Sequence, residues 1–113
     1  MATPIVFVPH QAMRFEQDLN RCVPALDISK AAAYGRIVTV TSSSHAVVYT
    51  ADLQLQIKSA MAEYQQGRDF ILAVGDPIII SACAIEASKK GDFIDFLKWN
   101  RSAKLYVHER VYL

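Results

Sequence analysis

The chain has 113 residues, of which 52% are hydrophobic and 20% are charged. This composition excludes a disordered tail, and a chain of this length can bury a core without a metal or a disulfide. The formal net charge of +1 gives no overall attraction to nucleic acid or to an anionic membrane surface.

The first part of the chain predicts a strand followed by a helix. Residues 1–4 lack the basic and apolar regions of a signal peptide, so we expect a cytoplasmic protein without membrane contact. Residues 5–8 lie between two prolines and read as a short apolar strand. Apolar residues at helical spacing predict a helix over residues 11–23, with Cys22 on its apolar side.

The middle of the chain continues the alternation of helices and strands. Residues 27–34 predict a short helix, and the β-branched run over residues 36–41 predicts a strand. The most polar loop of the chain, residues 42–45, follows this strand. A second amphipathic helix is predicted over residues 51–66, because its apolar residues form one stripe, and Gly67 stops it.

The strongest local signals lie in the strand and helix that follow. Residues 70–74 form a continuous apolar run, typical of a strand that is covered on both faces. Asp76 suits the N-cap of a helix, and Pro77 suits the first helical position, where no N–H is needed. The helix is expected over residues 77–90, with Gly91 as a left-handed cap.

This helix is apolar nearly all round, which predicts burial on more than one side. It is shorter than the roughly 20 residues that span a bilayer. Part of its surface, at Ile78, Ile79 and Ile85, is a candidate contact with another subunit. Cys83 lies inside it and, like Cys22, reads as a reduced core thiol.

The last elements are two strands. Residues 93–99 complete a βαβ unit with the strand at 70–74. Residues 105–113 alternate strictly, which predicts an antiparallel strand at an edge of the sheet. We therefore predict one α/β domain over residues 1–113, with a mixed sheet of about five strands and helices packed on it. Strands 36–41, 70–74 and 93–99 should be parallel, and the position of strand 5–8 stays open.

A polar cluster is predicted where two of these strands end. If strands 36–41 and 70–74 are neighbours, Ser43, Ser44 and His45 face Asp76 at the edge where open α/β sheets bind ligands. Serine and histidine together suggest a hydrolase. The G-x-S-x-G elbow of many hydrolases is absent, and a helix cap explains Asp76 more simply. The His and Cys residues are scattered singly, so we expect no metal and no cofactor.

A second candidate site is an interaction surface on the C-terminal strand. Aromatic and cationic residues share one face of that strand and can stack bases or anchor a protein partner. The residues of this surface are Tyr106, His108, Arg110 and Tyr112, with Lys98 nearby. Alternatively, a helix such as residues 11–23 packs over the tyrosines. If the edge is open, dimerisation from strand to strand is its simplest use.

The C-terminal part also resembles a group of known proteins. The resemblance rests on LAVGDP at residues 72–77, the alanine-rich helix after it, LKWNR at residues 97–101, and a closing strand with Tyr106. Residues 70–111 thus resemble small proteins encoded by tailed bacteriophages, most of which have no known function. The resemblance covers about the last third of the chain. It implies a phage origin and a place in the host cytoplasm, but it suggests no reaction.

Three functional hypotheses follow, in order of preference. The first is a small non-enzymatic phage accessory protein that acts through protein–protein contacts as a homodimer, with a host protein as a further candidate partner. The alternative is a protein that binds single-stranded nucleic acid through the C-terminal strand. The second alternative is a small hydrolase that uses the serine and histidine of the polar loop.

Overall fold

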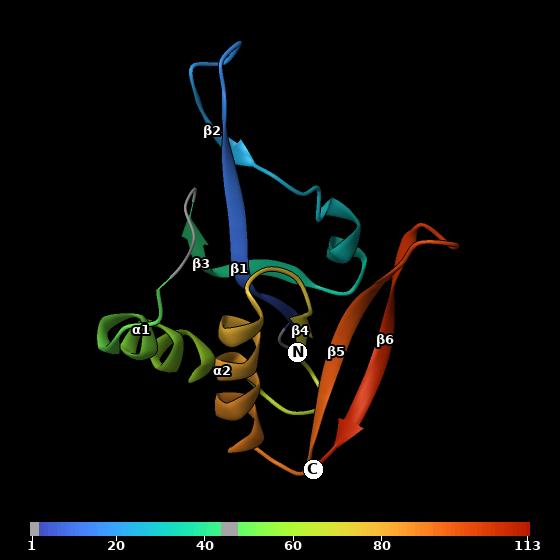
Figure 1. Cartoon of the computed structure of the whole chain (residues 1–113). Helices are drawn as coiled ribbons and strands as arrows, with labels where there is room; N and C mark the ends of the chain where they lie inside the picture. Colours follow the sequence, from blue (N-terminus) through green and yellow to red (C-terminus); the bar gives the residue numbers. More distant parts are fainter. Residues whose placement is uncertain (1–2, 44–47) are drawn as a thin grey trace.

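The computed structural model describes residues 3–43 and 48–113 (Figure 1). It confirms the predicted α/β fold, in which helices pack on a mixed sheet. The elements in chain order are β1 (Ile5–Glu16), β2 (Arg21–Pro24), the 3-10 helix η1 (Ser29–Ala33), β3 (Arg36–Ser43), α1 (Ala51–Met61), β4 (Phe70–Leu72), α2 (Pro77–Ser88), β5 (Phe93–Asn100) and β6 (Leu105–Tyr112).

The sheet is built around β1. The strand order is β2-β1-β4-β5-β6, and β3 also pairs with β1. Strands β3, β4 and β5 are parallel as predicted. β1, whose position the sequence left open, is parallel to them, whereas β2 and β6 are antiparallel to their neighbours. Val6 of β1 pairs with Ile37 on one side and with Phe70 on the other. The strands expected at residues 36–41 and 70–74 are therefore not neighbours, because β1 lies between them.

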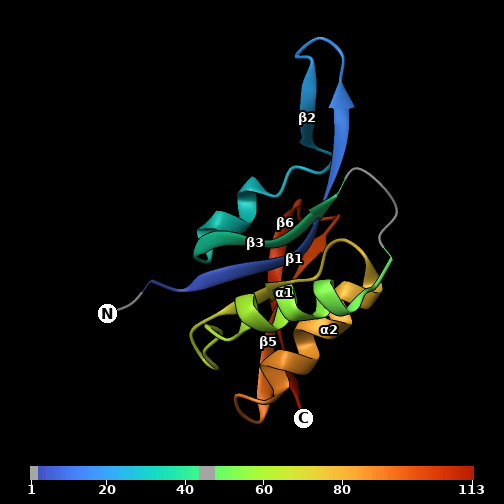
Figure 2. The same ribbon diagram turned by 90° about the vertical axis from the view of Figure 1, so that its left-hand side faces the viewer.

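β1 extends far beyond the predicted strand at residues 5–8, and the predicted helix over residues 11–23 is wrong. The chain instead continues to Glu16, turns and returns as β2, in a hairpin that projects from the body of the fold (Figure 2). Pairing with β2 and β3 satisfies backbone groups that a helix would satisfy internally. The expected apolar stripe has no core to cover, since Phe15 and Cys22 are exposed.

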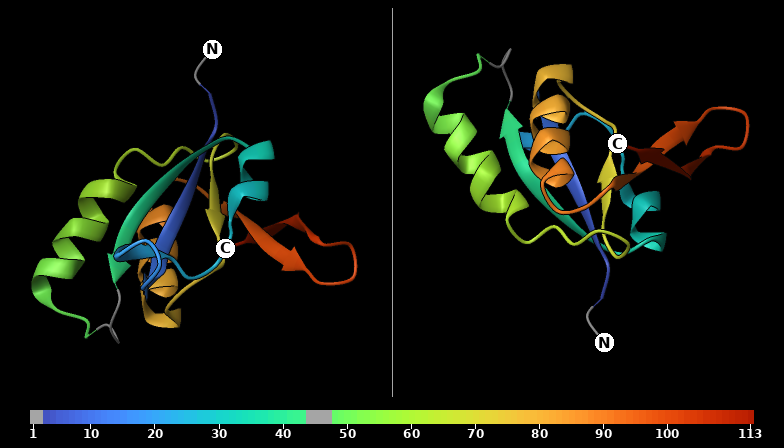
Figure 3. Two further views of the ribbon diagram at one scale, coloured as in Figure 1. Left: turned by 90° about the horizontal axis from the view of Figure 1, so that it is seen from above. Right: turned by 90° about the horizontal axis from the view of Figure 1, so that it is seen from below.

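The two faces of the sheet have separate cores. Figure 3 shows α1 and α2 on one side of the sheet and η1 on the other. The core under the helices consists of Ile5, Phe7, Val40, Ile57, Met61, Tyr64, Ile71, Ile79, Cys83, Ala87 and Ile94. The core under η1 consists of Val6, Val8, Ile28, Ala31, Leu72, Leu97 and Tyr106. Consecutive residues of β1 alternate between the two cores, as the two-residue period of a strand requires.

Both helices begin where predicted and end earlier. The helix expected over residues 51–66 ends at Met61, and the helix expected over residues 77–90 ends at Ser88. Gly91 is not a left-handed cap, because the described glycines with positive φ are at other positions. A Cβ at Gly91 would instead collide with the side-chain amide of Gln66. Among the described residues, we find no helix long and apolar enough to cross a membrane.

Candidate interaction surface

The β5–β6 hairpin forms as predicted, and β6 ends the sheet. The N–H of Leu113 donates to the carbonyl oxygen of Asp92 over 2.9 Å, which makes these two residues a hydrogen-bonded pair. Such pairs alternate with non-hydrogen-bonded pairs along an antiparallel ladder. Every second residue of β6, including His108, Arg110 and Tyr112, therefore directs its backbone N–H and C=O groups away from β5. These groups face the open edge.

Two of the predicted surface residues hold a buried carboxylate. Asp95 of β5 is 3% exposed and lies opposite Arg110 in the ladder. Arg110 donates from Nε and Nη2 to its two carboxylate oxygens over 2.8 and 3.3 Å, and His108 Nε2 lies 2.7 Å from Oδ1. Burial opposes ionisation, but the hydrogen bonds from Arg110 and His108 prevail and hold the pKa of the Asp95 carboxyl below its usual value.

Asp95 was not among the site residues predicted from the sequence, although the sequence contains a signal that could have identified it. A short hairpin between residues 93–99 and 105–113 restricts the register, and one register sets Asp95 opposite Arg110. An acidic residue in an otherwise apolar strand needs a cationic partner when it is buried. The two observations together identify the cluster of Asp95, His108 and Arg110.

The other predicted surface residues do not share one exposed face. Tyr106 is 2% exposed, and its carbonyl oxygen accepts a hydrogen bond from the Tyr34 hydroxyl over 2.8 Å. The element that covers it is η1 with its flank, and not a helix over residues 11–23. Lys98 lies on the opposite face of the hairpin, where its amino group is 3.2 Å from Glu109. Tyr112 is 71% exposed and packs at a tilt on Phe93.

The residues of the hydrolase hypothesis are only partly described. Ser44 and His45 lie outside the described residues, and Ser43 pairs with Ala12 at the end of β3. Asp76 caps α2, and its Oδ1 accepts the N–H groups of Ile78 and Ile79 over 2.8 and 3.2 Å. The capping role that the sequence predicts for Asp76 is therefore confirmed. Because β1 separates the two strands, the premise that brought Asp76 beside the serines does not hold.

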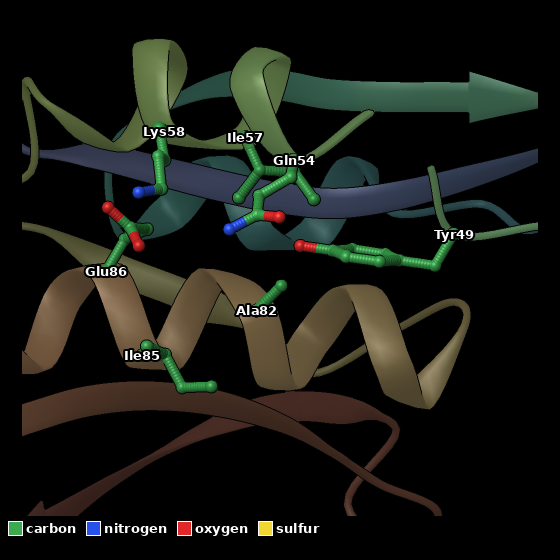
Figure 4. Close-up of a pocket in the computed structure, with 7 residues that line it drawn as sticks. All are labelled: Tyr49, Gln54, Ile57, Lys58, Ala82, Ile85 and Glu86. Atoms are coloured by element: carbon green, nitrogen blue, oxygen red, sulfur yellow. The ribbon is translucent and has the colours of Figure 1, made fainter. Parts of the chain in front are cut away.

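A shallow groove lies between the two helices on the other side of the molecule. Figure 4 shows Gln54, Ile57 and Lys58 of α1 opposite Ala82 and Glu86 of α2. The cavity measures only about 80 Å³. Ile85, which also lines the groove, is 59% exposed. On the same helix Ile78 is 60% exposed, while Ile79 is buried. The helix thus has one buried side and one apolar side open to solvent.

Comparison with known proteins gives one match. A family model described as phage Pam3 gp32-like protein matches residues 4–113. No curated protein and no solved structure matches the chain. The match confirms a relationship to phage proteins. It also corrects the extent of the resemblance, which reaches over nearly the whole chain and not only over residues 70–111.

Proposed function

Because the chain belongs to the family of phage Pam3 gp32-like proteins, we propose that it is a non-enzymatic accessory protein of the infected host cytoplasm. It acts through protein–protein contacts, and its first partner is a second copy of itself. The observation that carries this proposal is the open edge of β6. The phage origin follows from the family, whereas the contacts and the dimer are our proposal.

The open edge is suited to strand addition. β6 spans eight residues and has no neighbour on its outer side among the described strands. The Tyr106 carbonyl already accepts the Tyr34 hydroxyl, but the outward N–H and C=O groups from His108 to Tyr112 form a template for another strand. A second β6, added antiparallel about a two-fold axis, would extend the sheet from one copy into the next and satisfy these groups on both sides.

The apolar surface of the β5–β6 hairpin also supports pairing with a second copy. The tip of the hairpin projects away from the body of the fold (Figure 1). A two-stranded hairpin is only marginally stable in water without a hydrophobic face to cover it. Several large apolar side chains in and after the hairpin are nevertheless exposed, namely Trp99, Leu105, Val111, Tyr112 and Leu113. A second hairpin packed beside the first would remove part of this surface from water.

A proline at the open edge tests the proposal. His108 directs its N–H outward, so His108→Pro removes one edge donor and keeps the pairing with β5. His108→Ala is the matched control, because it loses the same contact with Asp95 and retains the N–H. We expect light-scattering mass across a dilution series to show a dimer for the wild type and for His108→Ala. The proline variant should remain monomeric at concentrations where the control is dimeric.

Two results would contradict the proposed homodimer through the β6 edge. A wild-type protein that is monomeric at all concentrations would rule out the homodimer. A His108→Pro variant that dimerises as tightly as His108→Ala would rule out the β6 edge as the interface. In the second case, Ile85→Lys would test the exposed side of α2 as the dimer interface.

A further inference from the structure

An open cavity lies at the amino end of β4, next to Tyr106 and His108 of β6. It measures about 690 Å³, which is within the usual range for small-molecule sites. The residue before β1, the end of η1 and the segment before β4 border it, and it is broadly open to solvent. Its lining consists of Pro4, Ala33, Tyr34, Gln65, Gly67, Arg68 and Phe70. Nothing in the sequence analysis pointed to this site, because its residues come from three separate segments.

Aromatic rings form one side of the cavity. Tyr34 and Phe70 meet edge to face with ring centroids 5.5 Å apart, and Phe70 meets His108 in the same way over 5.3 Å. The hydroxyl of Tyr34 is tied to the carbonyl oxygen of Tyr106, so its ring is held in place. Tyr34 and Phe70 are only half-buried, and they offer a fixed aromatic surface to a flat ligand.

A fixed guanidinium forms a second side. Arg68 donates from Nε and Nη2 to the two oxygens of Asp69 over 2.7 and 2.8 Å. Asp69 is fully buried and also accepts the backbone N–H groups of Ile5 and Gln65 over 2.9 Å each. Nη1 of Arg68 makes no hydrogen bond within the described residues. Because the carboxylate of Asp69 balances the charge of Arg68, the guanidinium attracts anions only weakly. Its role in the cavity is to provide hydrogen-bond donors at fixed positions.

Gln65 supplies the third side. Its backbone takes part in the turn before β4, whereas its side-chain amide is exposed and makes no hydrogen bond to another described residue. An amide has both donors and an acceptor. Because Gln65 and Arg68 both line the cavity, their side chains together can recognise a ligand edge that carries donors and acceptors.

We propose that this cavity binds a nucleobase. A flat heteroaromatic ring would stack on Phe70 and meet Tyr34, whose ring is inclined at 65° to that of Phe70, edge to face. Its polar edge would meet Gln65 and Arg68. Base stacking on aromatic side chains tolerates any base, while the polar edge sets a preference. The base can belong to a free nucleotide or to single-stranded nucleic acid, and the chemistry of the site is the same. This site differs from the C-terminal strand, where Tyr106 is buried.

The proposal predicts a particular dependence on salt. Binding that rests on phosphate contacts weakens steeply as salt rises, because counterions are released. Binding that rests on stacking and on the neutral pair of Arg68 and Asp69 should change little. We therefore expect thymidine and adenosine, which carry no phosphate, to bind with an affinity that is nearly the same at low and high salt.

The test is an NMR titration of the full chain with thymidine, with adenosine and with the oligonucleotide (dT)10. Phe70→Leu keeps apolar bulk without a ring, and we expect it to lower the affinity about tenfold, within the range known for base stacking. Gln65→Ala leaves the backbone bonds intact and should change the preference between the two nucleosides. Gln17→Ala, at the exposed turn between β1 and β2, is the matched control and should bind as the wild type does.

The titration results support or overturn the proposed nucleobase site. A nucleoside that binds the wild type and loses affinity in Phe70→Leu supports the site, and much tighter binding of (dT)10 then identifies a single strand as the source of the base. No binding of any probe at millimolar concentration overturns the proposal. Equal binding by Phe70→Leu and the wild type also overturns it. If Phe70→Leu does not fold, an unchanged preference in Gln65→Ala refutes the assigned polar edge.

Discussion

Replacement of Asp95 by asparagine should destabilise the protein while keeping its shape. The carboxylate accepts two short hydrogen bonds, from Arg110 over 2.8 Å and from His108 over 2.7 Å, and a longer one from Arg110 over 3.3 Å. Hydrogen bonds to a charged group are worth about 1 kcal/mol more than neutral ones. The side chains of Arg110 and His108 are 37% and 40% exposed, so solvent recovers part of the loss.

We therefore expect Asp95→Asn to lower the free energy of unfolding by about 2 kcal/mol at neutral pH. For a chain of this length, this corresponds to a fall in Tm of about 8 °C. Urea unfolding and a thermal scan would measure both quantities. The m-value should stay the same, because the substitution does not change the surface exposed on unfolding.

The pH dependence tests the electrostatic origin of this loss. The pKa of Asp95 is lowered in the folded protein, so its contribution is fully present above the pKa of about 3.9 in the unfolded chain. The contribution is lost as the pH falls through the folded pKa. The difference between the wild type and Asp95→Asn should accordingly shrink below about pH 4. A difference that is as large at pH 3 as at pH 7 would refute the reasoning.

The partner variant provides a second check. Arg110→Met leaves the Asp95 carboxylate buried with only His108 as its partner, and a buried charge without compensation is costly. We expect Arg110→Met to be more destabilising than Asp95→Asn. The double variant should be more stable than Arg110→Met alone, because asparagine removes the uncompensated charge. A double variant whose losses simply add would show that the two side chains act independently.

Three further predictions concern local features of the fold. Gly75 has a φ of +101°, and a Cβ there would collide with the carbonyl oxygen of His10, so Gly75→Ala should cost about 3 kcal/mol in urea unfolding. A loss below about 1 kcal/mol would contradict the geometry. Asp76→Ala removes the cap of α2 and should cost about 1 kcal/mol, whereas Asp76→Asn, which still caps, should cost less. Burial raises the pKa of the Cys83 thiol to about 12, so iodoacetamide at pH 8 should label the exposed Cys22 and leave Cys83 unmodified. Peptide mass spectrometry would measure the labelling, and rapid labelling of both cysteines would contradict the burial of Cys83.

The candidate surfaces could be predicted only in part. The alternation of residues 105–113 correctly indicated an edge strand, and the lone Asp95 could have been paired with Arg110 from the hairpin register. The burial of Tyr106 could not be foreseen, because it depends on η1, which lies far away in the sequence. The cavity of Tyr34, Gln65 and Phe70 was likewise invisible, since no local pattern links those segments.

Local chemistry by itself determined the central βαβ unit. The run of apolar residues before Gly75, the cap at Asp76 and the proline after it all act within a few residues, and each keeps its effect in the folded chain. The edge hairpin is similar, because its strands are joined by a short turn. Where near neighbours satisfy the backbone and the side chains, the sequence pattern is sufficient.

Tertiary structure alone decided the course of β1. The apolar spacing over residues 11–23 is compatible with a helix, and helical bonds would satisfy its backbone. In the folded chain, hydrogen bonds to β2 and β3 satisfy the same backbone groups. β3 lies too far along the sequence for a local pattern to predict its pairing with β1. The first half of β1 becomes the centre of the sheet for the same reason. Its place between β3 and β4 is set by the simultaneous burial of both its faces in two separate cores.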